Sequence, residues 1–214
     1  MVMAPGKASA VVVSGPSGSG KTTLVKHLML RYPQSHFSIS ATTRTLRGEE
    51  VDGVDYRFIS REKFESLRNA GEMLEWAEVH GEFYGTPRKE VERALDQDLH
   101  VFLDIDVQGG LQVKEALGPR AWLLYVLPPD RETLETRLRG RGTEDEEKVA
   151  LRLTNALGEL AELPKYDAVV VNDDLARAVD EADQLMRSRQ HNENEWFSSG
   201  GRELLKERFG LDLP

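Results

Sequence analysis

The 214-residue chain contains no cysteine. Disulfide bonds, catalysis by a thiolate and zinc sites built from thiolates are therefore excluded. Apolar runs long enough to cross a membrane are also missing, and residues 1–7 lack the apolar centre of a signal peptide. A cytoplasmic location is therefore the default expectation. The histidines, at positions 27, 36, 80, 100 and 191, do not have the spacing of metal ligands, and we interpret them as structural or surface residues.

The chain also has fewer positively charged than negatively charged residues. The chain has 28 lysines and arginines against 37 aspartates and glutamates, a formal net charge of −9. An acidic protein does not attract the phosphate backbone of nucleic acids through its overall surface. We therefore expect small-molecule partners and neither nucleic acid nor a membrane, while protein partners stay unknown.

A glycine-rich stretch at residues 14–23 carries the strongest signal in the chain. It fits the pattern Gly-x-x-x-x-Gly-Lys-[Ser/Thr], in which backbone N–H groups cradle phosphates, the lysine (Lys21) reaches the β- and γ-phosphates and the hydroxyl (Thr22) binds Mg²⁺. A glycine-rich turn that binds nothing is the alternative. The setting favours the phosphate loop, because a short apolar strand (10–13) precedes it and a helix with apolar residues near the 3.6 period (23–31) follows it. The predicted phosphate-binding residues are Gly15, Pro16, Ser17, Gly18, Ser19, Gly20, Lys21, Thr22 and Thr23.

Strands and helices alternate over most of the chain. Such alternation predicts an α/β fold in which a parallel sheet of the P-loop NTPase type carries helices on both faces. The expected strands are residues 10–13, 36–40, 101–104, 123–127 and 168–171, and the expected helices are residues 23–31, 87–96, 108–118, 131–139, 146–163 and 175–189.

Two regions break this alternation. Residues 41–86 are polar and rich in turns, with strands expected at 55–59 and 74–79 around a helix at 62–69. We interpret them as an insertion with a small sheet of its own. The last residues, 191–214, are expected to form a flexible tail with a marginal helix at 203–209 and no chemistry, so that removing them leaves activity within a few-fold.

Two aspartates follow the apolar strand at 101–104 and therefore lie at the carboxyl edge of the sheet, where open α/β folds bind ligands. Asp104 is predicted to hold Mg²⁺ through water, as the second half of a nucleotide site. Asp106 is open to another interpretation, because an aspartate at this place also caps a helix.

Arginines gather in two places. Arg44 and Arg47, with Tyr56 and Tyr84, suit a doubly charged phosphate, although two arginines in a polar loop more often form a solvated surface. The second set surrounds glycines 140 and 142 and suits a lid that closes over a transferring phosphoryl group. Its members are Arg131, Arg137, Arg139 and Arg141, with Arg152 on the next helix.

Eight short stretches, taken in order, resemble the guanylate kinase family, whose members phosphorylate GMP with ATP. They are residues 14–23, 38–44, 53–56, 75–77, 84–86, 103–109, 139–144 and 171–175. The resemblance divides residues 8–190 into a core (8–37, 87–129 and 149–190), a GMP-binding insertion (38–86) and a lid (130–148), and it leaves residues 191–214 outside.

The same resemblance implies a role for each matching residue. It implies that guanine lies at Ser40, Glu75, Thr86 and Asp106, and the GMP phosphate at Arg44, Arg47, Tyr56 and Tyr84. It implies that ATP phosphates lie at Lys21, Arg137, Arg141 and Arg152, with Asn172 near adenine, and that Mg²⁺ accompanies ATP. Strand alternation alone would make Glu75 a surface residue.

The chain departs from the family at two positions. The family usually reads Thr-Arg-x-Pro-Arg-x-Gly-Glu, whereas Leu46 replaces the proline here and Glu49 the glycine. Both arginines are kept. A glutamate in place of a turn glycine would strain the loop or add repulsion near the phosphate.

Two other functions remain open at this point. Some scaffold proteins carry a guanylate-kinase-like domain that binds protein ligands, but such domains typically lack the complete phosphate loop that is present here. A sugar-phosphate kinase of the same fold would have no use for Ser40, Glu75 and Thr86.

Overall fold

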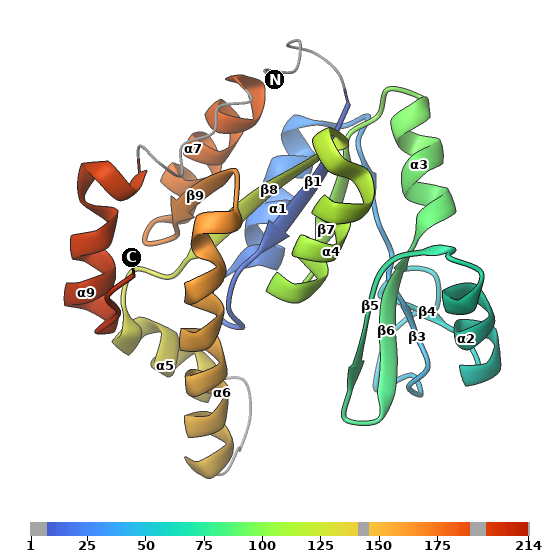
Figure 1. The fold of residues 1–214 in the computed structure, drawn as a ribbon, viewed down its shortest axis with the longest axis horizontal. Coiled ribbons are helices and arrows are strands. Elements are labelled where there is room, and N and C mark those ends of the chain that lie inside the picture. The colour runs from blue at the N-terminus through green and yellow to red at the C-terminus, as the bar shows by residue number, and fades with distance from the viewer. Residues whose placement is uncertain (1–7, 141–145, 189–195, 214) are drawn as a thin grey trace.

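The structure is a computed structural model that describes residues 8–140, 146–188 and 196–213. Its centre is a parallel five-stranded sheet in the order β2-β7-β1-β8-β9 (Figure 1), as the alternation of strands and helices predicts. The three middle strands consist of buried apolar residues, apart from Ser14 and Asp104 at two strand ends. The strands are β1 (Ala10–Ser14), β2 (His36–Phe37), β7 (Val101–Asp104), β8 (Ala121–Leu127) and β9 (Ala168–Val171).

Helices cover both faces of this sheet, because alternate residues of a strand point to opposite faces. Val11 and Val13 pack with α1 (Lys21–Arg31) and α7 (Leu175–Ser188) on one face. Ala10 and Val12 pack on the other face with α3, α4 and the C-terminal helix α9. These three helices are α3 (Arg88–Asp96), α4 (Val107–Leu117) and α9 (Arg202–Phe209), and a short 3-10 turn, η1 (Gly118–Arg120), follows α4.

A second, four-stranded sheet in the order β4-β3-β6-β5 confirms that residues 41–86 hold a small sheet of their own. It packs on α2 around the buried side chains of Ala41, Phe64, Met73 and Phe83. The sequence interpretation missed β6, which pairs antiparallel with β5, because its polar and glycine-containing residues lack a clear period of two. The elements are β3 (Ala41–Thr42), β4 (Arg57–Phe58), α2 (Arg61–Asn69), β5 (Met73–Val79) and β6 (Glu82–Pro87).

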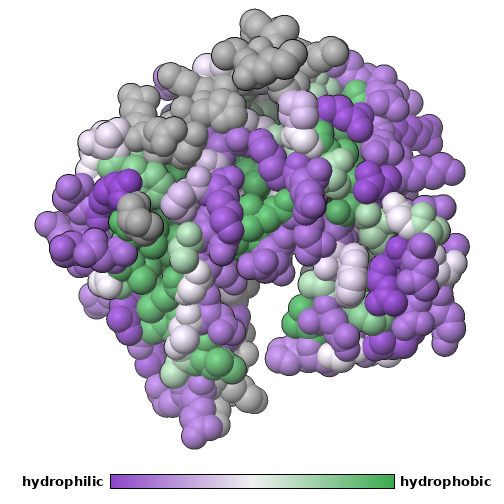
Figure 2. Space-filling model, in the orientation of Figure 1, coloured by the Kyte–Doolittle hydropathy of each residue, from purple (hydrophilic) through white to green (hydrophobic). Residues whose placement is uncertain are grey.

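Helices α5 (Arg131–Arg139) and α6 (Glu146–Glu159) pack on one another through a small apolar cluster that contains Leu134, Leu138 and Leu153. They extend from one side of the central sheet, and the second sheet extends from the other (Figure 1). Figure 2 shows the molecule hollowed between these two parts. Helix α6 ends at Glu159 rather than near residue 163, and a 3-10 turn (η2, Leu160–Lys165) follows, because Pro164 has no N–H to continue the helix.

The C-terminal segment differs from the expected flexible tail. Phe197, Leu205 and Phe209 are buried in the same apolar cluster as strands β1 and β8. The π-helical turn η3 (Phe197–Gly201) leads into α9, and Arg208 donates a 3.1 Å hydrogen bond to the Pro129 carbonyl, just before α5. The apolar residues of α9 are too few to hold an isolated helix, and the tertiary contact supplies the missing burial. Within the described ranges, no helix is both long and apolar enough to span a bilayer.

Candidate active site

The loop between β1 and α1 has the backbone of a phosphate cradle. Gly15 and Gly20 have φ angles of +143° and +93°, and a Cβ atom at these positions would lie 2.3 Å from the Val126 carbonyl oxygen and 2.2 Å from Asn172 Nδ2. Only glycine therefore fits at either place. No side chain caps the N-terminus of α1. The first turn of α1, with its N–H groups and the positive end of the helix dipole, lines the cavity in front of the loop.

Two oxygen ligands meet beside this loop. Thr22 Oγ1 donates a 2.6 Å hydrogen bond to Asp104 Oδ2, and both residues line a cavity of about 330 Å³ together with Lys21. A hydroxyl and a carboxylate are the hard oxygen donors that Mg²⁺ prefers. Among the described residues, no group of three or more histidines, aspartates and glutamates could hold a metal by itself. A magnesium ion here would take most of its ligands from phosphate and water.

A second cavity, of about 500 Å³, opens between the two sheets and shares Ser17, Tyr56 and residues 104–106 with the first. Its wall contains Ser40, Glu75 and Asp106. Glu75 is paired in register with Thr86, whose hydroxyl donates a 2.6 Å hydrogen bond to Glu75 Oε1. Asp106 caps α4 by accepting a 2.7 Å hydrogen bond from Gly109 N. The structure therefore brings the four predicted guanine-site residues together, and Asp106 is a helix cap as well.

Glu75 is buried, with only 6% of its surface exposed, whereas strand alternation had favoured the surface. A shift in the pairing register between Met73 and Glu75 accompanies this orientation. Burial raises the pKa of the Glu75 carboxyl to about 7, the Thr86 hydrogen bond lowers it, and the charge of Asp106 raises it further. The group therefore titrates close to neutral pH.

The four residues predicted to hold a phosphate are only partly brought together. The Arg44 guanidinium is buried, lies 5.0 Å from the centre of the Tyr56 ring and is close enough to Tyr84 to hydrogen-bond its hydroxyl. The rings of Tyr56 and Tyr84 are 6.0 Å apart. Arg47 is exposed and does not line either cavity.

The loop around Arg47 accommodates Leu46 and Glu49, the two departures from the family pattern, without backbone strain. Gly48 has the positive φ angle, +53°, whereas Glu49 is not among the residues with positive φ. Glu49 is therefore not strained, since the turn has moved its glycine by one position. Both Leu46 and Glu49 are exposed.

Arginines of α5 and α6 contact the phosphate loop. Arg137 Nη1 lies 3.3 Å from the Gly18 carbonyl oxygen, and Arg152 Nη2 donates a 3.1 Å hydrogen bond to Ser17 Oγ. Arg139 pairs with Glu135 and Glu146 instead, and Arg131 is exposed. Arg141 lies outside the described residues. Two of the predicted arginines thus lie against the phosphate loop.

Asn172 supports the loop from the far side. Its Nδ2 donates a 2.7 Å hydrogen bond to the Ser19 carbonyl, and the residue is buried. It lines a hollow of about 510 Å³ with Thr23, Arg137 and Asp173, next to the phosphate loop.

Comparison with known proteins agrees with this arrangement. The family model described as Guanylate kinase matches residues 7–189. The chain belongs to the guanylate kinase family. It is accordingly a nucleoside monophosphate kinase, an ATP:GMP phosphotransferase.

Relatives of this family cover most of the chain. It is 52% identical to the guanylate kinase of Nitratidesulfovibrio vulgaris over 80% of this chain and 82% of that protein. It is 45% identical to that of Thermosynechococcus vestitus, over 82% and 91%. The crystal structure of guanylate kinase from Anaplasma phagocytophilum matches with a TM-score of 0.68 and 31% identity, and covers 97% of this chain and 98% of that one.

Two glutamates at the guanylate kinase site were not predicted from the sequence. Glu50 holds Arg44 with two hydrogen bonds of 2.6 and 2.7 Å and also accepts one from Arg47 N at 2.9 Å. Its position three residues after Arg47, at the end of the pattern Thr-Arg-x-Pro-Arg-x-Gly-Glu, is a signal that could have found it. Glu159, at the end of α6, lines the phosphate-loop cavity, and only tertiary structure brings it there.

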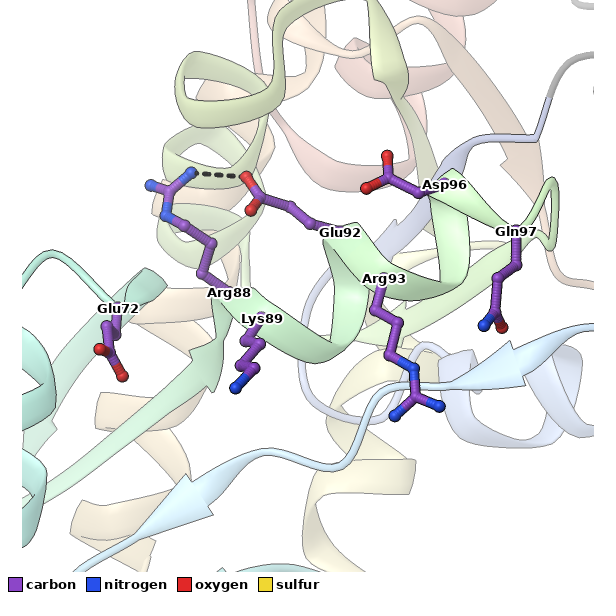
Figure 3. A pocket seen from close by; sticks show the side chains of 7 residues that line it. All are labelled: Glu72, Arg88, Lys89, Glu92, Arg93, Asp96 and Gln97. Carbon is purple, nitrogen blue, oxygen red and sulfur yellow. Dashed lines mark hydrogen bonds and ion pairs between the residues drawn. The ribbon is translucent and has the colours of Figure 1, made fainter.

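A further hollow of about 510 Å³ lies on α3, away from all the predicted site residues. Figure 3 shows Lys89, Arg93 and Gln97 leaving the helix on one side, while Arg88 forms a 3.2 Å ion pair with Glu92 on the other. The wall carries charges of both signs, Glu92 pairs with Arg88, and Asp96 pairs with Arg120 of η1, so this hollow offers no set of groups that converge on a ligand.

Proposed function

We propose that the chain transfers the γ-phosphoryl group of Mg-ATP to GMP, yielding ADP and GDP, and so serves purine nucleotide metabolism and GMP recycling in the cytoplasm. The observation that carries this proposal is the pair of connected cavities. One is lined by the phosphate loop and the other by Glu75, and they share Ser17, Tyr56 and Asp104. A donor and an acceptor phosphate bound in them would meet at the shared wall.

The residues at the ATP end would bind the triphosphate and offset its negative charge. The N–H groups of residues 15–23 would bind the phosphate oxygens, and Lys21 would exchange its present hydrogen bonds to the Gly15 and Pro16 carbonyls for the β- and γ-phosphates. Thr22 and Asp104 would hold Mg²⁺, the latter through water, and the metal would reduce the charge of the triphosphate. Asn172 would lie beside adenine.

The GMP end would read the base and anchor the phosphate. Guanine presents two adjacent donors, N1–H and the N2 amine, which an ionised Glu75 can accept as a bidentate pair. Ser40, Thr86 and Asp106 would complete the base site. Adenine has an acceptor at N1, which would face the carboxylate, so AMP is disfavoured. The GMP phosphate would bind Arg44, Tyr56 and Tyr84, and Arg47 would join them once its loop closes.

In the reaction itself, an oxygen of the GMP phosphate forms a bond to the γ-phosphorus of ATP. At the same time, the bond between the γ-phosphorus and the oxygen that bridges it to the β-phosphorus breaks, and ADP leaves. The attacking phosphate is largely dianionic near neutral pH, so no general base is required. Catalysis would come from alignment and from Arg137, Arg141, Arg152 and Lys21 near the transferring group. Closure of the predicted lid, residues 130–148, over the hollow in Figure 2 would exclude water from the phosphates, beside which Arg137 and Arg152 already lie.

An assay of ADP release at fixed Mg-ATP tests this function. GMP should support turnover, whereas AMP, UMP and sugar phosphates should be poor acceptors. Equal turnover with a sugar phosphate would contradict the base-reading role of the second cavity. Nucleotide binding without any turnover would point instead to a binding module.

A further inference from the structure

Glu159 is a carboxylate in a cavity built for anions. Arg152, two turns earlier on α6, contacts Ser17 of the phosphate loop, so the face that carries both residues is turned toward the loop. Glu159 lines the same cavity as Lys21, Thr22 and Asp104. A negative charge at this place opposes the phosphates for which the loop is built.

The other carboxylates of this cavity are already engaged. Asp104 accepts from Thr22, and Asp106 accepts from Gly109. Glu159, in contrast, accepts no hydrogen bond from the part of the chain that the structure describes. It is therefore not explained as a helix cap or as an anchor for a loop.

The charged and titratable groups around Glu159 come from several elements. Burial raises its pKa to about 7, Lys21 of α1 lowers it, and Asp106 raises it. Tyr125 of β8 and Tyr166, just before β9, also lie within the reach of its charge. Lys21 is thus the cation that offsets Glu159 in the protein without nucleotide, and bound phosphates would compete for that cation.

We propose that Glu159 is a specificity-determining residue that disfavours uncomplexed ATP and so makes the site select the triphosphate whose charge a divalent cation has reduced. The inference rests on the proposed function. A carboxylate repels an anion in proportion to the anion's charge. Free ATP carries about four negative charges and its Mg²⁺ complex about two, so Glu159 weakens the binding of the free form more.

The size of the effect follows from this proportion. If the loss of the charge tightens binding of Mg-ATP about threefold, it should tighten binding of free ATP by about the square of that factor, roughly tenfold. The ratio of the two dissociation constants should then fall about threefold. A role that is only structural would change both constants by the same factor.

The experiment is calorimetric titration of the wild type, Glu159→Gln and Glu147→Gln with ATP at pH 8, once in excess Mg²⁺ and once in excess EDTA. Glu147 is a matched control, because it is exposed in the first turn of the same helix and its change to glutamine removes the same charge. Glu159→Asp, which keeps the charge, serves as the conservative variant. We expect the ratio of free to complexed dissociation constants to fall about threefold in Glu159→Gln, to fall part of the way in Glu159→Asp, whose charge is withdrawn by one methylene, and to stay near the wild-type value in Glu147→Gln.

An unchanged ratio in Glu159→Gln overturns the inference, and so does an equal fall in Glu147→Gln. If Glu159→Gln does not fold, Glu159→Asp decides, since withdrawing the charge by one methylene should lower the ratio part of the way and no fall would refute the proposal. A wild-type protein that neither binds Mg-ATP nor phosphorylates GMP would instead sink the proposed function. The two failures are therefore distinguishable.

Discussion

Replacing Glu75 with glutamine should stabilise the protein that has no substrate bound while damaging GMP recognition. The carboxyl is 6% exposed, and burial is the largest cause that raises its pKa to about 7. The unfolded chain has a carboxyl of ordinary pKa, near 4.5. The folded state therefore holds a proton that the unfolded state has already lost between these two values. Stability is lost as the pH rises from about 4.5 to about 7.

The magnitude follows from the difference in pKa. Each unit corresponds to about 1.4 kcal/mol, so at pH 8 the ionised Glu75 costs up to about 3 kcal/mol of unfolding free energy. At pH 5 the folded carboxyl is protonated and the cost is about 1 kcal/mol. Glutamine removes the charge and keeps a carbonyl oxygen that can accept from Thr86. Glu75→Gln should therefore be more stable than the wild type, and the difference should grow with pH.

Urea unfolding at pH 5 and pH 8 measures this difference. Glu78→Gln is the matched control, because Glu78 lies on the same strand β5 and is exposed. The same Glu75→Gln protein should show a sharp fall in kcat/KM for GMP and a smaller GMP-over-AMP ratio, and adding Ser40→Ala should reduce that ratio further. If Glu75→Gln gained no stability over Glu78→Gln at pH 8, the buried-carboxylate reasoning would be refuted.

Three other substitutions test separate parts of the molecule. Lys21→Ala should lower kcat about 10²–10³-fold with unchanged circular dichroism, because the ammonium stabilises transition-state charge; near-normal turnover would contradict the nucleotide site. Glu50→Gln should raise KM for GMP roughly tenfold with little change in kcat, because Arg44 loses a charge-assisted hydrogen-bond partner. Steady-state kinetics measure this change, and an unchanged KM would mean that Glu50 is not required to hold Arg44 in place. Leu205→Ala should cost about 2–5 kcal/mol of unfolding free energy, because the side chain is fully buried; a loss below 1 kcal/mol in urea would mean that the C-terminal helix is dispensable for the core.

The sequence alone determined the phosphate loop and the alternating plan of the central sheet. Both depend on rules that act over short stretches of the chain. A phosphate loop needs glycine where its backbone comes too close to other atoms for a Cβ, and apolar residues recur with the period of a strand or a helix. The same rules placed Asp104 at the end of its strand, where it meets Thr22. Residues whose place in the fold is set by the local sequence pattern were therefore predictable.

Tertiary structure decided the rest. Strand alternation put Glu75 at the surface, but the sheet of the insertion folds against α4 and buries it beside Gly109. The sequence predicts only a marginal helix in a flexible tail, and the core stabilises that helix because it offers Leu205 and Phe209 an apolar surface. Glu159 reaches the phosphate loop from the end of a distant helix. In each case the deciding contact joins residues far apart in the chain, and local propensity carries no information about such contacts.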